Sequence, residues 1–313
     1  MSETPYLQNL VIRLSSGLET WPESRIDQCA QYFLQAQHSD GGFGGREGGS
    51  DLYYSAFAIR SLAILGQMYG PVAEQSANYL KTQLDQTVPL VDLLSFLFAG
   101  FQVQAASGLD VFQNLPSGWE ANVLEMLEQL RRDDGGYAKS TQTQLGSTYQ
   151  TFLVLLAYQL FQQPIADPQR TIDFLLSQKS DDGAFREVKV GKRSSTNPTA
   201  AAIASLLILD ALDETTAQQT VDFLCDMQTL EGGLRANTRI PVADLLSTFT
   251  GLLTLQDLGA ATELDLRSMQ QFTQQLQVEP GGYRGALLDP GHDVEYSFYG
   301  LGTDALLSRL LAK

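Results

Sequence analysis

IPVADLLSTFTGLL (residues 240–253) has a close counterpart in VPLVDLLSFLFAGF (residues 88–101), which starts 152 positions earlier in the chain. Proline, aspartate, two leucines and a serine occupy matching positions in the two stretches. Self-similarity of this kind indicates that one structural unit is repeated along the chain. The period of that repeat then decides which fold class is considered first.

A short turn with two small residues provides a second repeated feature. It occurs as Asp40–Phe43, Asp134–Tyr137, Asp182–Phe185, Glu231–Leu234 and Pro280–Tyr283. The first glycines of these turns are separated by 94, 48, 49 and 49 residues. The first interval is a double step, so one unit has lost its glycines, and residues 88–101 fall in that gap. The sequence therefore predicts six units.

Each unit predicts a pair of helices with different surroundings. A first helix, such as SRIDQCAQYFLQAQ (residues 24–37), has one apolar face and ends in polar residues before the glycine turn. A second helix, such as DLYYSAFAIRSLAILG (residues 51–66), is apolar around most of its circumference and should be buried on several sides. Six inner and six outer helices result.

Stacked units of this type predict an all-α fold, an (α/α)6 toroid in which one ring of helices surrounds another. Units that cannot bury their apolar face alone must pack against their neighbours. Helices with one solvent-exposed face alternate with buried helices, which favours closure of the chain into a ring. We predict that residues 25–313 form a single toroid domain, preceded by an N-terminal extension or helix over residues 1–24.

The repeated aspartate is interpreted first as a helix cap. Asp, Ser and Asn side chains accept hydrogen bonds from the free amides of a first helical turn. Such residues stand near the start of all six predicted inner helices: Asp51, Asp92, Ser147, Asn197, Asp244 and Asp293. Pro89 and Pro241 precede two of these caps and should keep the loop from becoming helical too early.

Composition narrows the functional classes. Hydrophobic residues make up 43% of the chain and charged residues 18%, enough to build a sizeable core. A formal charge of −16 argues against nucleic acid as a partner. No membrane span and no secretory signal are expected, so we expect a cytoplasmic protein. Cys29 and Cys225 are expected to be free thiols in helices.

The glycine turns before apolar helices, at this period, resemble the repeats of protein prenyltransferase β subunits and squalene-type cyclases. The resemblance covers about residues 25–311 and is closest to the β subunit of farnesyl- and geranylgeranyltransferases. It implies an isoprenoid chain in a central apolar cavity, with its diphosphate near the glycine loops. It also implies a possible helical α-subunit-like partner.

The resemblance places the zinc site of that family at two helix starts. Asp244 matches the family's aspartate, but Leu246 stands at the cysteine position and Tyr296 at the histidine position. Leucine cannot ligate zinc, and tyrosine is an uncommon substitute for imidazole. We therefore predict no zinc and no other cofactor. An alternative metal site of Asp244, His292 and Glu295 remains open.

Two sets of residues are predicted to bind the isoprenoid diphosphate. Cations in the glycine loops, beside the inner-helix N-termini, are suited to the anion. These candidates are Lys189, Lys192, Arg193, Arg235 and Arg239. Aromatic residues in the early turns of the inner helices are suited to the apolar chain. These candidates are Tyr54, Phe57, Phe152, Phe249 and Tyr299.

The predicted activity is prenyl transfer to an acceptor, with Asp244, Asp293, Glu295 and Tyr296 as the candidate catalytic residues. Three alternatives stay open. A terpene cyclase of the squalene type would use an Asp-x-Asp-Asp sequence, which is missing here. A toroid could bind a lipid or a partner without catalysis. Hydrolysis or lysis of a carbohydrate would need paired carboxylates, for which Asp293 and Glu295 are the candidates.

Overall fold

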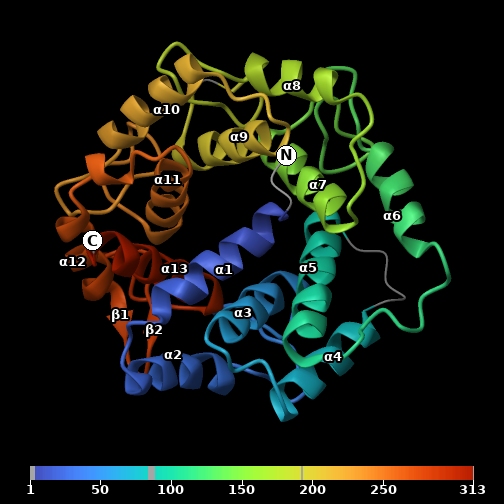
Figure 1. The fold of residues 1–313 in the computed structure, drawn as a ribbon, viewed down its shortest axis with the longest axis vertical. Coiled ribbons are helices and arrows are strands. Elements are labelled where there is room, and N and C mark those ends of the chain that lie inside the picture. The colour runs from blue at the N-terminus through green and yellow to red at the C-terminus, as the bar shows by residue number, and fades with distance from the viewer. Residues whose placement is uncertain (1–3, 84–88, 192, 313) are drawn as a thin grey trace. The chain divides into compact units, whose positions relative to one another are not determined.

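The computed structural model describes residues 4–83, 89–191 and 193–312. Its secondary structure is helical apart from one short hairpin of β1 (Gln277–Val278) and β2 (Gly282–Tyr283) (Figure 1). The predicted second helices of the units are α3 (Leu52–Ile64), α5 (Leu90–Ser107), α7 (Thr148–Leu160), α9 (Thr196–Ile208), α11 (Leu245–Asp257) and α13 (Val294–Leu311). The predicted first helices are α2 (Glu23–Gln35), α4 (Pro71–Thr82), α6 (Trp119–Glu128), α8 (Pro168–Ser177), α10 (Glu214–Asp226) and α12 (Leu266–Leu276). Helix α1 (Tyr6–Leu18) precedes them, and a 3₁₀ turn, η1, covers Ala261–Glu263.

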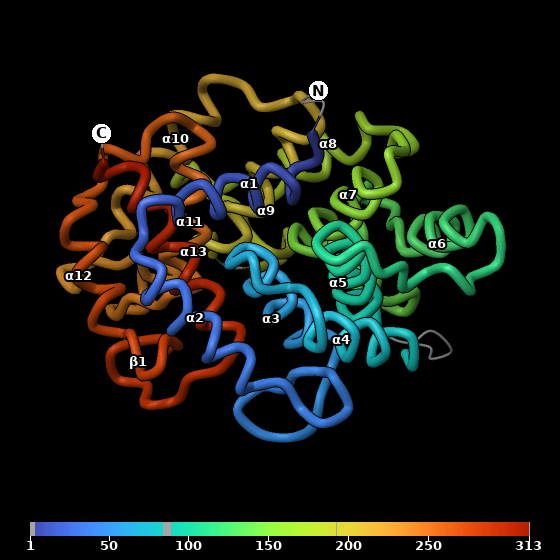
Figure 2. Tube along the Cα trace, turned by 60° about the horizontal axis from the view of Figure 1, so that its bottom comes forward, coloured from blue at the N-terminus to red at the C-terminus, as the bar shows by residue number. Residues whose placement is uncertain are grey.

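The chain divides into two compact units. Unit 1 consists of the residues up to Asn9 and of Ser117–Ser268, and unit 2 consists of Leu10–Pro116 and the residues from Met269 onward. Within unit 1, α9 packs against α7 and α11, and within unit 2, α3 packs against α5 and α13 (Figures 1 and 2). The boundaries predicted from the sequence, an extension of residues 1–24 and one domain of residues 25–313, stay a prediction.

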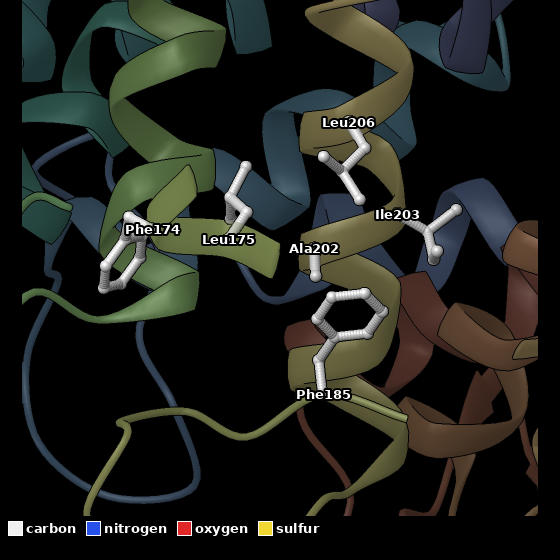
Figure 3. Packing of buried hydrophobic residues seen from close by; sticks show 6 residues of the cluster. All are labelled: Phe174, Leu175, Phe185, Ala202, Ile203 and Leu206. Carbon is white, nitrogen blue, oxygen red and sulfur yellow. The ribbon is translucent and has the colours of Figure 1, made fainter. Parts of the chain in front are cut away.

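Each glycine turn brings together the two helices of its own sequence repeat. Gly183 has φ +83°, a conformation that favours glycine, and a Cβ there would lie 2.6 Å from the carbonyl oxygen of Gln219. Phe185, two residues later, is fully buried. Figure 3 shows its ring beside Ala202, in a cluster with Leu206 of α9 and with Phe174 and Leu175 of α8. The turn therefore inserts one large side chain between the two helices of unit 1 that flank it.

A hydroxyl in five of the inner helices secures the turn that precedes the helix. The backbone N–H of Phe185 donates to Thr199 Oγ1 at 2.9 Å, and both groups are buried. The same bond recurs at Phe43 and Ser55, Tyr137 and Thr151, Leu234 and Thr248, and Tyr283 and Ser297. A buried amide without a partner is costly, so these Ser and Thr residues support the repeat as directly as the glycines do. The sequence analysis did not identify them.

The predicted helix caps are confirmed at four of the six positions. Asp51, Ser147, Asp244 and Asp293 each accept a hydrogen bond from the backbone N–H three residues later. The prediction is wrong for Asp92, because α5 begins earlier, with Pro89 at the cap position and Asp92 in the first turn. It is also wrong for Asn197, because α9 is preceded by Ser195 and Asn197 lies inside the first turn.

Helix α5 is long and apolar enough, by length and composition, to cross a membrane. A core helix of a soluble protein satisfies the same criterion, and α5 packs against both α3 and α4 within unit 2. The composition of this helix therefore fits its place between other helices.

Candidate functional site

In unit 2, aromatic side chains of α3 and α13 form one continuous group, the α3–α13 ring cluster. Its members are Tyr53, Tyr54, Phe57, Tyr296, Phe298 and Tyr299. Phe57 is central: its ring centroid lies 5.1 Å from that of Tyr53 and 5.4 Å from those of Phe298 and Tyr299. The i, i+4 spacing of Tyr53 and Phe57 places both rings on one face of α3. The α13 rings of Phe298 and Tyr299 are buried, whereas the α3 rings are half-buried and keep part of their surface open.

Glu295 lies at the edge of this cluster, in the first turn of α13. Its Oε1 accepts hydrogen bonds from the hydroxyl of Tyr53 at 2.7 Å and from that of Tyr299 at 3.4 Å. Burial raises the pKa of the Glu295 carboxyl, and the nearby Asp293 carboxylate raises it further, while the two bonded hydroxyls act in the opposite direction. Desolvation favours the neutral acid, which is the form that can donate a proton.

Asp293 and Tyr296, the other two candidates on α13, have structural partners. Asp293 Oδ1 caps the helix by accepting from the Tyr296 backbone N–H at 2.9 Å. Its Oδ2 accepts from Arg46 Nε at 3.2 Å, and Arg46 also forms a bidentate pair with Asp289. The Arg46 guanidinium lies 5.5 Å from the centroid of the Tyr296 ring. Glu295 is therefore the carboxylate of this region that is presented to aromatic rings.

Arg60 lies at the other end of the ring cluster and was missed in the sequence analysis. Its Cζ is 5.3 Å from the ring centroid of Phe298 and 5.9 Å from that of Phe57. Tyr53, Phe57 and Arg60 follow an i, i+4, i+7 spacing, and that pattern was the available signal. Glu295 thus lies at the Tyr53 end of the cluster and Arg60 at the other end, and Tyr53 and Arg60 are about 10 Å apart along α3 at 1.5 Å per residue.

Asp244, the fourth candidate, lies in unit 1 and caps α11. Its Oδ1 accepts from the Ser247 backbone N–H at 2.7 Å and its Oδ2 from the Ser247 hydroxyl at 2.9 Å. Burial raises the pKa of its carboxyl despite these bonds. The interpretation of Asp244 as an N-cap is confirmed.

The residues at the family's zinc positions do not fit that ion. Leu246 offers no donor, and Tyr296 offers a phenol in place of an imidazole. His292, part of the alternative metal site, is exposed and its Nδ1 lies 2.9 Å from the Tyr32 hydroxyl. In the part of the chain that the structure describes, no group of three or more His, Cys, Asp and Glu side chains is arranged to hold a metal. That the protein binds no zinc stays a prediction.

The remaining predicted lipid-binding residues belong to unit 1. Phe152 of α7 is half-buried, and its ring lies 5.9 Å from that of Tyr6 at the start of α1. Phe249 of α11 is only 4% exposed and so packs inside the unit. Tyr54, Phe57 and Tyr299, by contrast, all belong to the ring cluster of unit 2.

The predicted diphosphate-binding cations lie in two loops of unit 1. Lys189 and Arg239 are exposed, Arg193 is half-buried, and Lys192 lies outside the described residues. Arg235 is also half-buried, and its Nη2 donates to the carbonyl of Asp226 at 3.2 Å, at the last residue of α10. An arginine at a helix C-terminus satisfies carbonyls that have no intrahelical partner. Arg235 therefore has a structural task besides any contact with an anion.

The two cysteines are free thiols, as expected. Burial raises the pKa of Cys29 in α2 to about 11, and it raises that of Cys225 in α10 to about 11. Thiolates are the reactive form, so neither side chain is suited to nucleophilic chemistry at neutral pH.

Two solved structures with the same fold cover nearly the whole chain. Candida albicans protein geranylgeranyltransferase-I complexed with GGPP is 15% identical, with a TM-score of 0.70 over 89% of this chain and 90% of that one. A single-residue variant of the type II terpene cyclase MstE from Scytonema, in complex with geranylgeranyl dihydroxybenzoate, is 14% identical, with a TM-score of 0.62 over 97% of this chain and 98% of that one. No curated protein sequence matches.

A family model, the prenyltransferase alpha-alpha toroid domain, matches residues 10–88 and 72–312. Together with the structural similarities, this match confirms the predicted fold class, an all-α α/α toroid. It also confirms the resemblance from which the functional expectations were drawn. The chain belongs to the prenyltransferase alpha-alpha toroid family.

Proposed function

We propose that this protein binds an isoprenoid diphosphate and that its α3–α13 ring cluster contacts the isoprenoid chain. The observation that carries the proposal is the pair of half-buried rings of Tyr53 and Phe57, packed against the buried rings of α13 with centroids 5.1–5.4 Å apart. Such a surface is suited to a flexible unsaturated chain, because each buried methylene contributes about 0.8 kcal/mol. The similar Candida albicans and Scytonema structures contain geranylgeranyl compounds.

The wider proposal keeps the residues predicted from the sequence. In unit 1, Phe152 and Phe249 stay predicted contacts of an isoprenoid chain, and Lys189, Lys192, Arg193, Arg235 and Arg239 stay predicted contacts of a diphosphate. Charge-assisted hydrogen bonds from Arg and Lys are the strongest contacts available to such an anion. Transfer of the prenyl group to an acceptor, with or without an α-subunit-like partner, would follow the family resemblance.

The test is titration calorimetry with geranylgeranyl diphosphate, geranylgeraniol and isopentenyl diphosphate. The long diphosphate should bind more tightly than isopentenyl diphosphate by orders of magnitude, since most of the affinity comes from the chain. Phe57→Ala should weaken it by about tenfold or more. Phe161→Ala, a half-buried ring at the end of α7 that packs against Trp119, is the matched control and should have no effect.

Geranylgeraniol, which has the same chain without the diphosphate, tests the chain contacts separately from the diphosphate contacts. Neutralising Arg193, Lys192, Arg235 and Arg239 should weaken the diphosphate far more than geranylgeraniol, because only the diphosphate needs the cations. If neither long-chain ligand binds at high micromolar concentration, the isoprenoid proposal fails. A toroid that binds a protein partner would then be the better account.

Glu295 favours a second candidate function, proton-initiated cyclisation of an isoprenoid. A carboxyl with a raised pKa beside aromatic rings could protonate a terminal carbon–carbon double bond. The ring faces of Tyr53, Phe57 and Tyr299 could then stabilise the resulting carbocation. Loss of a proton from the cyclised cation would end the reaction and leave the product neutral.

Product analysis decides between the two reactions. Under the cyclase proposal, incubation with geranylgeranyl diphosphate yields a cyclised isomer that keeps its diphosphate, and Glu295→Gln abolishes this product while ligand affinity is kept. Under the transferase proposal, the product is a prenylated acceptor with release of diphosphate. A cyclised product formed undiminished by Glu295→Gln would eliminate Glu295 as the acid.

A further inference from the structure

The two oxygens of the Glu295 carboxyl have different surroundings. Oε1 accepts hydrogen bonds from the Tyr53 hydroxyl at 2.7 Å and from the Tyr299 hydroxyl at 3.4 Å. Among the residues that the structure describes, none donates a hydrogen bond to the other oxygen, Oε2. Nor is Oε2 one of the enclosed side-chain atoms of this part of the chain that lack a partner, so it is accessible. The protein therefore holds one oxygen of this carboxyl and leaves the other open to a ligand.

The phenol of Tyr53 is itself fixed by its neighbours. Its ring meets those of Tyr54 and Phe57 edge to face, with centroids 5.4 Å and 5.1 Å away. Packing on two sides restricts the rotamers of a side chain, so the Tyr53 hydroxyl has a defined position. Tyr299, by contrast, lies on the same helix as Glu295 and forms the longer of the two bonds. Tyr53 is therefore the residue that ties the carboxyl to a second helix, α3.

The two bonds to Oε1 decide which oxygen of the neutral acid carries the proton. A protonated carboxyl has one O–H donor and one carbonyl oxygen that accepts. Because Oε1 already accepts from two hydroxyls, it takes the part of the carbonyl oxygen. The proton of the neutral acid therefore resides on Oε2, the oxygen that a ligand can reach.

The other charged and titratable groups around Glu295 act on it from a distance. Burial has the largest effect and raises the pKa of Glu295, Asp293 on the same helix raises it further, and Arg46 lowers it. The Arg46 guanidinium is bonded to both Asp289 and Asp293. On α3, burial and then Glu295 raise the pKa of Tyr54. In the described part of the chain, none of these groups is hydrogen-bonded to Glu295, so the two tyrosine hydroxyls orient its carboxyl.

We propose that Tyr53 is a positioning residue for proton-initiated cyclisation: its hydroxyl holds Oε1 of Glu295, so that Oε2 delivers the proton to the terminal double bond of the isoprenoid. This inference rests on the cyclisation proposed above and deepens it. In this step the Oε2–H bond breaks, the π electrons of the double bond form the new C–H bond, and a carbocation and the Glu295 carboxylate remain. The bond from Tyr53 to Oε1 then becomes charge-assisted and stabilises that carboxylate. The cyclised cation loses a proton and the carboxylate regains one, so the net reaction is an isomerisation.

The first measurement is the steady-state kinetics of geranylgeranyl diphosphate cyclisation by Tyr53→Phe, which keeps the ring and removes only the hydroxyl. Its kcat should fall about a hundredfold, the effect of a small displacement of a catalytic group. KM should stay unchanged, because the chain still meets the same ring. Tyr299→Phe should have a smaller effect, since its bond to Glu295 is longer. Tyr79→Phe removes the hydroxyl of a buried tyrosine of α4, outside the ring cluster, and as the control should leave kcat unchanged.

The second measurement does not need the reaction. The carbon-13 signal of the Glu295 carboxyl, assigned by its loss in Glu295→Gln, follows the protonation of this group as pH is varied. A hydrogen bond to the charged form lowers a pKa, so Tyr53→Phe should raise the titration midpoint of Glu295. Tyr79→Phe should leave the midpoint where it is. Circular dichroism and thermal melts of every variant separate these effects from lost folding.

The outcomes separate this inference from the cyclisation proposal. An unchanged midpoint in Tyr53→Phe would overturn the inference, whether or not the wild type forms a cyclised product. A higher KM with an unchanged kcat would also overturn it, because Tyr53 would then only contact the chain. If the wild type binds geranylgeranyl diphosphate and forms no cyclised isomer, cyclisation fails and the inference fails with it. A shifted midpoint in that case would give the bond between Tyr53 and Glu295 a structural role only.

Discussion

Tyr53 and Glu295 are 242 positions apart in the chain, yet the tyrosine hydroxyl donates a hydrogen bond of 2.7 Å to the glutamate carboxyl. The bond joins the first turns of α3 and α13 in unit 2, at the edge of a cluster of aromatic rings. It links the acid whose pKa is raised by burial to the surface proposed to contact an isoprenoid.

Glu295→Gln should stabilise the protein at neutral pH. Because the folded-state pKa of Glu295 is raised, its contribution to stability is fully present below the unfolded pKa and is lost as pH rises through the folded pKa. Glutamine keeps an acceptor for the Tyr53 hydroxyl and has no charge to desolvate. The melting temperature of the variant should exceed that of the wild type at pH 7, and the difference should vanish under acid conditions.

Asp265→Asn is the control for this pH dependence. Hydrogen bonds from the Ser268 N–H and hydroxyl lower the pKa of Asp265, so its stabilising effect is present above the unfolded pKa and is lost on acidification. The difference between this variant and the wild type should have the opposite sign at pH 7. Equal curves for wild type and Glu295→Gln at all pH values would show that the carboxyl is not perturbed.

Asp244→Ala should destabilise the protein by about 1 kcal/mol, the typical effect of removing an N-cap. For a chain of this size, that corresponds to a loss of roughly 2–4 °C in melting temperature. Asp92→Ala changes the counterpart aspartate, which lies inside the first turn of α5 and does not cap it. This control should have a smaller effect, and an equal loss for both would argue against the capping explanation.

Thr199→Val should lower the free energy of unfolding more than the same substitution at the surface does. It leaves the buried N–H of Phe185 without its acceptor, which should lower the free energy of unfolding by about 1–3 kcal/mol. Thr199→Ser restores the hydroxyl and should recover much of the loss. Thr215→Val, at an exposed position of α10, provides the comparison. Urea denaturation measures all three, and identical midpoints for Thr199→Val and Thr215→Val would refute the role of the hydroxyl.

The purified protein should retain no stoichiometric zinc after dialysis, because Leu246 and Tyr296 replace two ligands that zinc needs. Elemental analysis of wild type and Asp244→Ala measures this directly. Zinc retained at one equivalent by the wild type and lost by Asp244→Ala, with the fold intact, would contradict the prediction. Asp244 would then have to be interpreted as a metal ligand instead of a helix cap.

The helix pattern and the caps at Asp51, Ser147, Asp244 and Asp293 were predictable because each depends on a few neighbouring residues. A glycine turn, a cap and an apolar period all act within one unit, and repetition strengthens the signal. The errors at Asp92 and Asn197 have a local cause as well. Pro89 occupies the cap position of α5 and Ser195 that of α9, two or three residues before the predicted caps. A hydrophobic pattern does not define a helix boundary to within two residues.

The sequence by itself determined the α/α toroid class, the order of inner and outer helices and the loss of zinc-type ligands at Leu246 and Tyr296. Only the tertiary structure decided that Glu295 is bonded by Tyr53, that Arg60 lies against Phe298, and that Arg235 is bonded to the end of α10. The first two contacts depend on how helices from different repeats pack, and the third on how a loop packs against the helix before it. A local pattern shows which face of a helix is apolar, but the neighbouring element decides which side chains meet there.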